Sequence, residues 1–129
     1  IPGFLQDGAT FASAWLAAHP EGEGPLAIWG CWEDPTIGAI SALKQQGRTD
    51  VFTYGENGAP DGLTAVRDGD LTATYWADSE REGEVLVEEI EKALDAGDSW
   101  TPIDIDVPGV LVTADNVEQF LADHPEELG

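Results

Sequence analysis

Apolar residues at helical spacing alternate along this chain with short apolar runs that are typical of strands. Phe4, Phe11 and Trp15 repeat at intervals of seven and four, which predicts one face of a helix. This helix is expected to end near 19–20, where a histidine precedes a proline. The short apolar run at 26–29 then predicts a strand. The pattern therefore opens with a helix followed by a strand.

The same order of helix and strand repeats twice more. Asp34 followed by Pro35 predicts a capping residue and the first helical position, and Gly47 predicts the end of this helix. The apolar residues of Val51–Tyr54 predict a second strand. A shorter helix then leads to a third predicted strand at Leu71–Trp76.

The last third of the chain begins with the most strongly amphipathic predicted helix. Ser79 and Glu82 have the spacing of a capping box, and Gly97 predicts the end of the helix. Within Ile103–Val107 apolar residues alternate with aspartates, which predicts an edge strand or a half-exposed strand. A further strand is expected at Val110–Thr113.

A final helix, capped by Asp115 or Asn116, completes a pattern that is typical of a parallel sheet. Each of the first three strands reaches the next through a helix, and these strands are nearly continuous apolar runs. The sequence therefore predicts an α/β fold, a three-layer α/β/α sandwich with a mainly parallel sheet. A length of 129 residues favours one domain.

Polar and aromatic residues follow each of the three predicted strands. The carboxyl ends of parallel strands meet at one edge of a sheet, and ligands of open α/β sheets bind there. We therefore expect these residues to share one rim. The residues are Trp32 and Glu33 after the first strand, Glu56 and Asn57 after the second, and Trp76, Ala77 and Asp78 after the third.

Charge is the unusual feature of the composition. Acidic residues number 26 against five basic ones, which gives a formal net charge of −21. The five basic residues are scattered, so a nucleic-acid groove and an anionic lipid surface are not expected as partners. Sixteen of the acids lie from Asp78 onward, mostly at predicted exposed positions, where they favour solubility.

Few residues offer catalytic chemistry. Cys31 is the only cysteine, so the sequence predicts neither an internal disulfide nor a cysteine-ligated zinc. His19 and His124 both precede prolines at predicted helix ends, away from the rim, so a nucleophilic triad is not expected. No glycine-rich phosphate loop opens a helix. The sequence therefore favours a binding protein without a cofactor over an enzyme.

The acids near the rim leave other readings open. Paired carboxylates could support glycoside hydrolysis at a suitable separation, which sequence does not give. A divalent metal site is a further alternative, although two of its four acids are better explained near helix starts. These four acids are Glu33, Asp34, Glu56 and Asp78.

Three segments in order carry a resemblance to a known family. The segments "IGAISALKQQG", "VFTYGENG" and "AVRDGDLTAT" resemble the C-terminal portion of periplasmic sugar-binding proteins of the ribose-binding type. The resemblance continues through "VLVTADNVEQFLADHPE" and covers essentially the whole chain. It implies the solute-binding component of a sugar ABC transporter, a type I periplasmic binding protein. Such a protein captures a monosaccharide or similar small polar ligand by hinge closure.

The resemblance also implies how this chain relates to a complete protein. Residues 1–129 would be an excised part of the second of two lobes, and the chain does not begin with methionine. The helix at 80–96 would cross to the missing first lobe. An incomplete sheet would leave an unpaired edge, through which two copies of the piece could form a homodimer. The implied partner is a membrane permease, and the implied location is extracytoplasmic, periplasmic or lipid-anchored.

At the rim the resemblance assigns positions residue by residue. Trp32 stands where the family usually has a polar ligand contact, and Asn57 stands where it commonly has an aspartate that hydrogen-bonds sugar hydroxyls. Ala77 stands where many members have glutamine, before the acid matched by Asp78. The departures at Trp32 and Ala77 make ribose itself doubtful as the ligand. The tryptophans at 32 and 76 could stack on a ligand ring or pack in the core. Asn57 could contact the ligand, or its role could be limited to supporting a turn with Gly58.

A lactose-repressor-type transcription regulator is the alternative, because its effector-binding core shares the implied fold. Its DNA-binding head would precede this chain. The acidic charge argues mildly against this alternative.

Overall fold

A computed structural model describes residues 3–22 and 24–128. The chain forms two compact units, one from residues up to 76 together with those from 111 onward, the other from Ala77–Val110.

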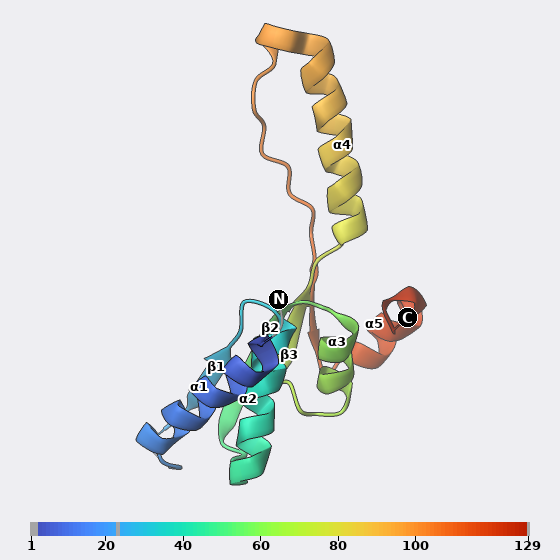
Figure 1. The fold of residues 1–129 in the computed structure, drawn as a ribbon. Helices are drawn as coiled ribbons and strands as arrows, with labels where there is room; N and C mark the ends of the chain where they lie inside the picture. Colours follow the sequence, from blue (N-terminus) through green and yellow to red (C-terminus); the bar gives the residue numbers. More distant parts are fainter. Residues whose placement is uncertain (1–2, 23, 129) are drawn as a thin grey trace. The chain divides into compact units, whose positions relative to one another are not determined.

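A four-stranded sheet in the order β1-β2-β3-β4 organises the first unit (Figure 1). Strand β1 pairs with β2 and β2 pairs with β3, both in parallel, which confirms the mainly parallel sheet. Strand β1 lies at one edge of the sheet. The strands are β1 (Leu26–Trp29), β2 (Val51–Asn57), β3 (Ala73–Trp76) and β4 (Val110–Thr113).

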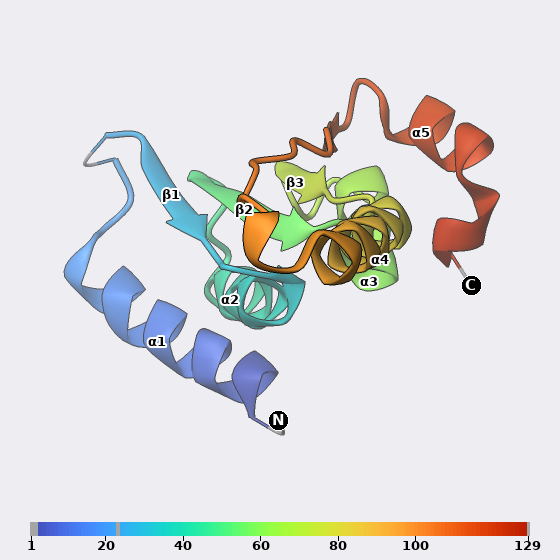
Figure 2. The same cartoon turned by 90° about the horizontal axis from the view of Figure 1, so that it is seen from above.

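Helix α2 packs against β1 and β2, and α1 packs against α2. Figure 2 shows α1 and α2 on the same side of the strands. Side chains at alternate strand positions face the helices and are buried, as at Thr53 and Thr74. The helices are α1 (Phe4–Ala18), α2 (Glu33–Gln46), α3 (Pro60–Arg67) and α5 (Val117–Asp123), followed by a 3-10 turn at Pro125–Leu128.

The opposite face of the sheet carries exposed aromatic side chains. Trp29, Phe52 and Tyr75 are 62%, 52% and 41% exposed. They share this face because Trp29 is aligned with Tyr54 and Tyr75 with Glu56 in the parallel register. These side chains lie where the second helical layer of the predicted sandwich would pack.

Helices α1 and α2 approach each other closely through small residues. A Cβ atom at Gly38 would lie 2.1 Å from the backbone oxygen of Leu5. Ala12, Ala39 and Ala42 form a buried cluster beside this crossing. The glycine therefore permits a backbone contact that any larger residue would prevent.

The start of α2 differs from the sequence prediction, whereas α5 starts after Asn116, one of its two predicted caps. Helix α2 begins at Glu33 with Trp32 as its N-cap, so Asp34 does not cap it and lies in the first turn. Asn116 is the N-cap of α5, but its side-chain oxygen accepts the Thr113 N–H at 2.7 Å instead of capping the helix. The asparagine therefore supports the preceding turn.

The second unit is the helix α4 (Ser79–Ala96), a 3-10 turn at Gly97–Ser99 and an extended segment. Asp78 caps α4 by accepting the Arg81 N–H at 2.9 Å, so the predicted Ser79 capping box is wrong. The predicted strand at Ile103–Val107 is also wrong, because no strand is assigned there. Its isoleucines line a hollow with apolar residues of α4 and remain 59% and 44% exposed.

No helix in the described residues combines the length and apolar character needed to cross a membrane.

Candidate functional site

Strand β2 carries the candidate site residue Asn57 at its carboxyl end. In the parallel register Trp29, the last residue of β1, is aligned with Tyr54, so β2 continues for three residues past that level. Asn57, the last residue of β2, is aligned with Trp76, the last residue of β3. The structure therefore brings Asn57 and the end of β3 together at the carboxyl edge, as the sequence predicts.

Asn57 has an unusual backbone conformation and an exposed side chain. Among the described residues, 3–22 and 24–128, Asn57 is the one residue other than glycine that has a positive φ angle, at 88°. Asparagine tolerates this left-handed region better than most residues. Its side chain is exposed. An exposed amide at the end of a strand offers both a hydrogen-bond donor and an acceptor to a ligand.

Glu33 lies beneath this turn rather than at the surface. Its side chain is 2% exposed, and one oxygen, Oε1, accepts two hydrogen bonds. The donors are the Gly58 N–H at 2.8 Å and the Thr74 hydroxyl at 2.6 Å. Glu33 thus ties the start of α2 to the turn after β2 and to β3.

Trp32 and Trp76 both make contacts inside the protein. The Trp32 ring meets the Phe4 ring edge to face, with centroids 4.6 Å apart, and remains half-buried. Trp76 is 8% exposed and packs against Phe120 and His124, with ring centroids at 5.3 and 4.9 Å. This burial favours the core-packing alternative for Trp76.

Ala77 and Asp78 begin the second unit. Asp78 uses its Oδ1 atom to cap α4 through the Arg81 N–H. Ala77 is half-buried and has no polar side-chain group. A ligand contact by either residue stays a prediction.

Sequence reasoning missed Thr74 and the glycines around Glu33. A Cβ atom at Gly62 would lie 2.2 Å from the Glu33 Cγ atom, and one at Gly55 would lie 3.5 Å from it. The available signal was a glycine inside a strand and another inside a short helix, positions where glycine usually marks a close approach.

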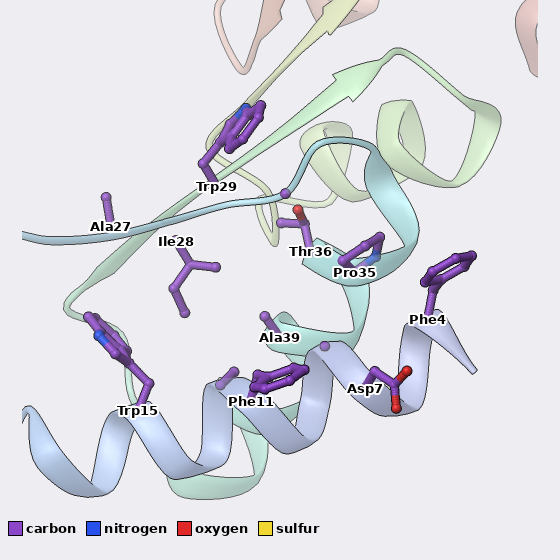
Figure 3. A pocket seen from close by; sticks show the side chains of 13 residues that line it. Phe4, Asp7, Phe11, Trp15, Ala27, Ile28, Trp29, Pro35, Thr36 and Ala39 are labelled. Atoms are coloured by element: carbon purple, nitrogen blue, oxygen red, sulfur yellow. The ribbon is translucent and has the colours of Figure 1, made fainter.

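An apolar groove of about 700 Å³ lies elsewhere in the first unit, between α1 and the edge strand β1. Figure 3 shows Phe11 and Trp15 from α1, with Ile28 on the strand side of the groove. Asp7 is the charged residue among those that line it. The sequence pattern predicted that these α1 aromatics share one face of a helix, and Phe11 on this face is 77% exposed. Most of the residues that line this groove are apolar or aromatic.

Within the described residues no group of three or more His, Cys, Asp or Glu side chains is arranged to hold a metal ion. Two of the four acids that were considered as a metal site have other roles. Glu33 accepts a hydrogen bond from Thr74 in the interior, and Asp78 caps a helix.

A family model decides the classification of the chain. The model of the periplasmic binding protein domain matches residues 5–98. The chain belongs to this family. The predicted resemblance to the ribose-binding type is thereby confirmed at the level of the family.

Three relatives show what this periplasmic binding protein domain is similar to. The ribose import binding protein of Escherichia coli K12 is 37% identical over 79 residues, which are 61% of this chain and 26% of that protein. The xylitol-binding protein of Mycolicibacterium smegmatis is 48% identical over 42 residues, which are 33% of this chain and 12% of that protein.

The third relative is a solved structure, an ABC transporter solute-binding protein from Agrobacterium vitis with bound allitol. It superposes with a TM-score of 0.82 at 30% sequence identity and covers 95% of this chain and 42% of its own. The chain therefore spans less than half the length of each of these relatives.

Proposed function

We propose that this domain is part of the solute-binding component of an ABC transporter that captures a sugar or polyol by hinge closure, without catalysis. The observation that carries the proposal is the exposed Asn57 side chain at the carboxyl end of β2, beside the end of β3. Polyhydroxylated ligands need groups that both donate and accept hydrogen bonds, and an amide does both. The ligands named for the three relatives, ribose, xylitol and allitol, support this ligand class.

The partner and location follow from the same proposal. A solute-binding protein of this kind delivers its ligand to a membrane permease and works outside the cytoplasm. The lactose-repressor-type alternative is less well supported, because the three relatives are solute-binding or import proteins.

Helix α4 is proposed to cross to a first lobe. The second unit buries none of the α4 residues, and four apolar side chains of this helix are exposed. An exposed apolar stripe of this length on one helix is typical of a surface that packs against another part of a protein. The four residues are Leu86, Val87, Ile90 and Leu94.

Calorimetric titration of the complete natural protein tests the proposal. The panel is ribose, allose, xylitol, allitol and myo-inositol, with sodium acetate as a charged control. We expect one-to-one binding of at least one polyhydroxylated compound and no consumption of it. Silence across the panel, or turnover of a bound compound, would contradict the proposal.

Two variants test the role of Asn57 in this binding. Asn57→Gly removes the whole side chain and allows the left-handed backbone at no steric cost, whereas Asn57→Leu adds backbone strain. We expect both to weaken binding by about tenfold or more, since a buried ligand hydroxyl loses its partner. Unchanged affinity in Asn57→Gly would remove Asn57 from the site.

A further inference from the structure

We propose that Glu33 is a positioning residue that sets the conformation of Asn57 through Gly58 and does not itself contact the ligand. The inference rests on the proposed function of Asn57. It changes the role predicted for Glu33, which the sequence placed among the ligand contacts.

The hydrogen bond from the Gly58 N–H to Glu33 restrains the peptide group that follows Asn57. The Gly58 N–H belongs to the peptide group that joins Asn57 to Gly58, and Glu33 Oε1 accepts it at 2.8 Å. The orientation of this peptide group fixes the ψ angle of Asn57. Both Asn57 and Gly58 have positive φ, at 88° and 69°. Glycine adopts such a φ freely, whereas at Asn57 it costs free energy that surrounding contacts must offset.

The turn is held from a second side by Trp76. A Cβ atom at Gly58 would lie 2.6 Å from Cβ of Trp76, so the turn backbone rests directly on this buried side chain. Glu33 supplies a hydrogen bond and Trp76 supplies a surface. Together they leave the Asn57 side chain as the exposed part of the turn.

The site is built to hold a carboxylate at this depth. Glu33 is the first residue of α2, where the helix N-terminus favours negative charge. Thr74 in β3 adds a hydroxyl donor to the same oxygen at 2.6 Å. Gly62 makes the space, because its missing Cβ would lie 2.2 Å from Glu33 Cγ. Buried polar groups are tolerated when they are hydrogen-bonded in this way.

A direct ligand contact by Glu33 does not fit this geometry. With 2% of its surface exposed, the side chain has almost no area to present. Its Oε1 atom already accepts two hydrogen bonds. Its effect on a ligand must therefore pass through the turn above it.

The test uses the complete natural protein labelled with ¹⁵N-glycine and ¹⁵N-asparagine. The variants are Glu33→Gln, which keeps the shape and one acceptor oxygen, Glu33→Ala, and Thr74→Val. Val112→Ala is the control, because Val112 is fully buried in β4 and is not a partner of Glu33. The readouts are the Gly58 and Asn57 amide resonances without ligand, and the affinities for xylitol and ribose.

We expect the Gly58 amide proton to move upfield in Glu33→Ala, with a smaller shift in Glu33→Gln because a neutral oxygen accepts a weaker hydrogen bond. Asn57 should shift with it. Affinity for the probe that binds should fall by about tenfold in Glu33→Ala and less in Glu33→Gln. Val112→Ala should change neither readout, although it lowers stability.

Two results would overturn the proposal. One is an unchanged Gly58 resonance in Glu33→Gln, a variant that preserves the side-chain shape if Glu33→Ala fails to fold. The other is an equal loss of affinity in Val112→Ala. If neither xylitol nor ribose binds the wild-type protein, the proposed function fails for these probes, and the Gly58 resonance still decides whether Glu33 sets the turn.

Discussion

A single glycine in α3 decides whether the Glu33 carboxylate fits. Gly62→Ala would place a Cβ atom 2.2 Å from Glu33 Cγ, a contact that must displace a buried side chain. Alanine favours an isolated helix by about 1 kcal/mol over glycine. We nevertheless expect a net loss of stability of about 1–3 kcal/mol, as is typical of an overpacked core. Urea unfolding measures the difference.

Gly83→Ala is the matched control for this prediction. Gly83 lies within α4, and a Cβ atom there would meet nothing within 4 Å. The same substitution should therefore raise stability by up to about 1 kcal/mol. If Gly62→Ala is as stabilising as Gly83→Ala, Glu33 does not occupy the space that the structure assigns to it.

The pair Arg48 and Asp50 gives a prediction about pH. Arg48 donates to both carboxylate oxygens of Asp50, at 2.7 and 2.8 Å, and to the backbone oxygen of His19 at 2.9 Å. The hydrogen bond from Arg48 holds the pKa of Asp50 below its ordinary value of 3.8. Because the pKa of Asp50 is lower in the folded state than in the unfolded state, the ion pair stabilises the protein at pH values above the unfolded-state pKa. This stabilisation is lost as the pH falls through the folded-state pKa.

Asp50→Asn tests this linkage. The wild type should be more stable than the variant at pH 7, and the difference should shrink as pH falls below 3.8. Urea unfolding of both proteins at pH 7, 5 and 3 measures it. A difference that stays constant over this range would show that the ion pair does not set the pKa of Asp50.

The candidate site was only partly predictable from single residues. Asn57 could be found, because its position after an apolar run and before a glycine marks a turn at the carboxyl end of a strand. The role of Glu33 could not be found. Its burial depends on Gly55, Gly62 and Thr74, which lie 22 or more positions away and come close only in the folded protein.

At the scale of elements, the crossing of α1 and α2 depends on backbone contact. Gly38→Ala would bring a Cβ atom to 2.1 Å from the Leu5 backbone oxygen, and neither backbone can yield without moving its helix. We expect a loss of about 1–3 kcal/mol in the free energy of unfolding. Gly83→Ala again provides the control. Equal effects of the two substitutions would contradict the close crossing.

Periodicity predicted most elements, because apolar spacing directly reflects which face of an element is buried. The helix over Phe4–Ala18 and the strand at Leu26–Trp29 were predicted close to their observed bounds. Ile103–Val107 failed because alternation alone does not supply a neighbouring strand for hydrogen bonding. The predicted start of α2 at Pro35 was wrong, because the helix begins two residues earlier, at Glu33.

At the scale of the whole molecule, the net charge of −21 should make stability depend on salt. Self-repulsion among like charges disfavours the compact state, and added salt screens it. Raising NaCl from 0.02 to 0.3 M should raise the melting temperature, by roughly 4 °C for each kcal/mol that is added to the free energy of unfolding. Calorimetry or circular dichroism measures this. A melting temperature that is flat or falls with salt would show that the acids are not mutually destabilising.

The edge strand β1 bears on self-association of the chain. β1 pairs with β2, and the sheet order places it at an edge. An unpaired edge is a template for another chain. A homodimer of the chain by itself therefore stays a prediction.

The central claim is that the end of β2 belongs to a ligand-binding mouth, with Asn57 as the contacting residue and Glu33 as its support. A crystal structure of the complete natural protein with its tightest-binding panel compound tests this most directly. The account predicts a ligand hydroxyl within hydrogen-bond distance of the Asn57 amide and no ligand atom at that distance from Glu33. A ligand bound away from the carboxyl ends of β1–β3, or bound directly by the Glu33 carboxylate, would contradict it.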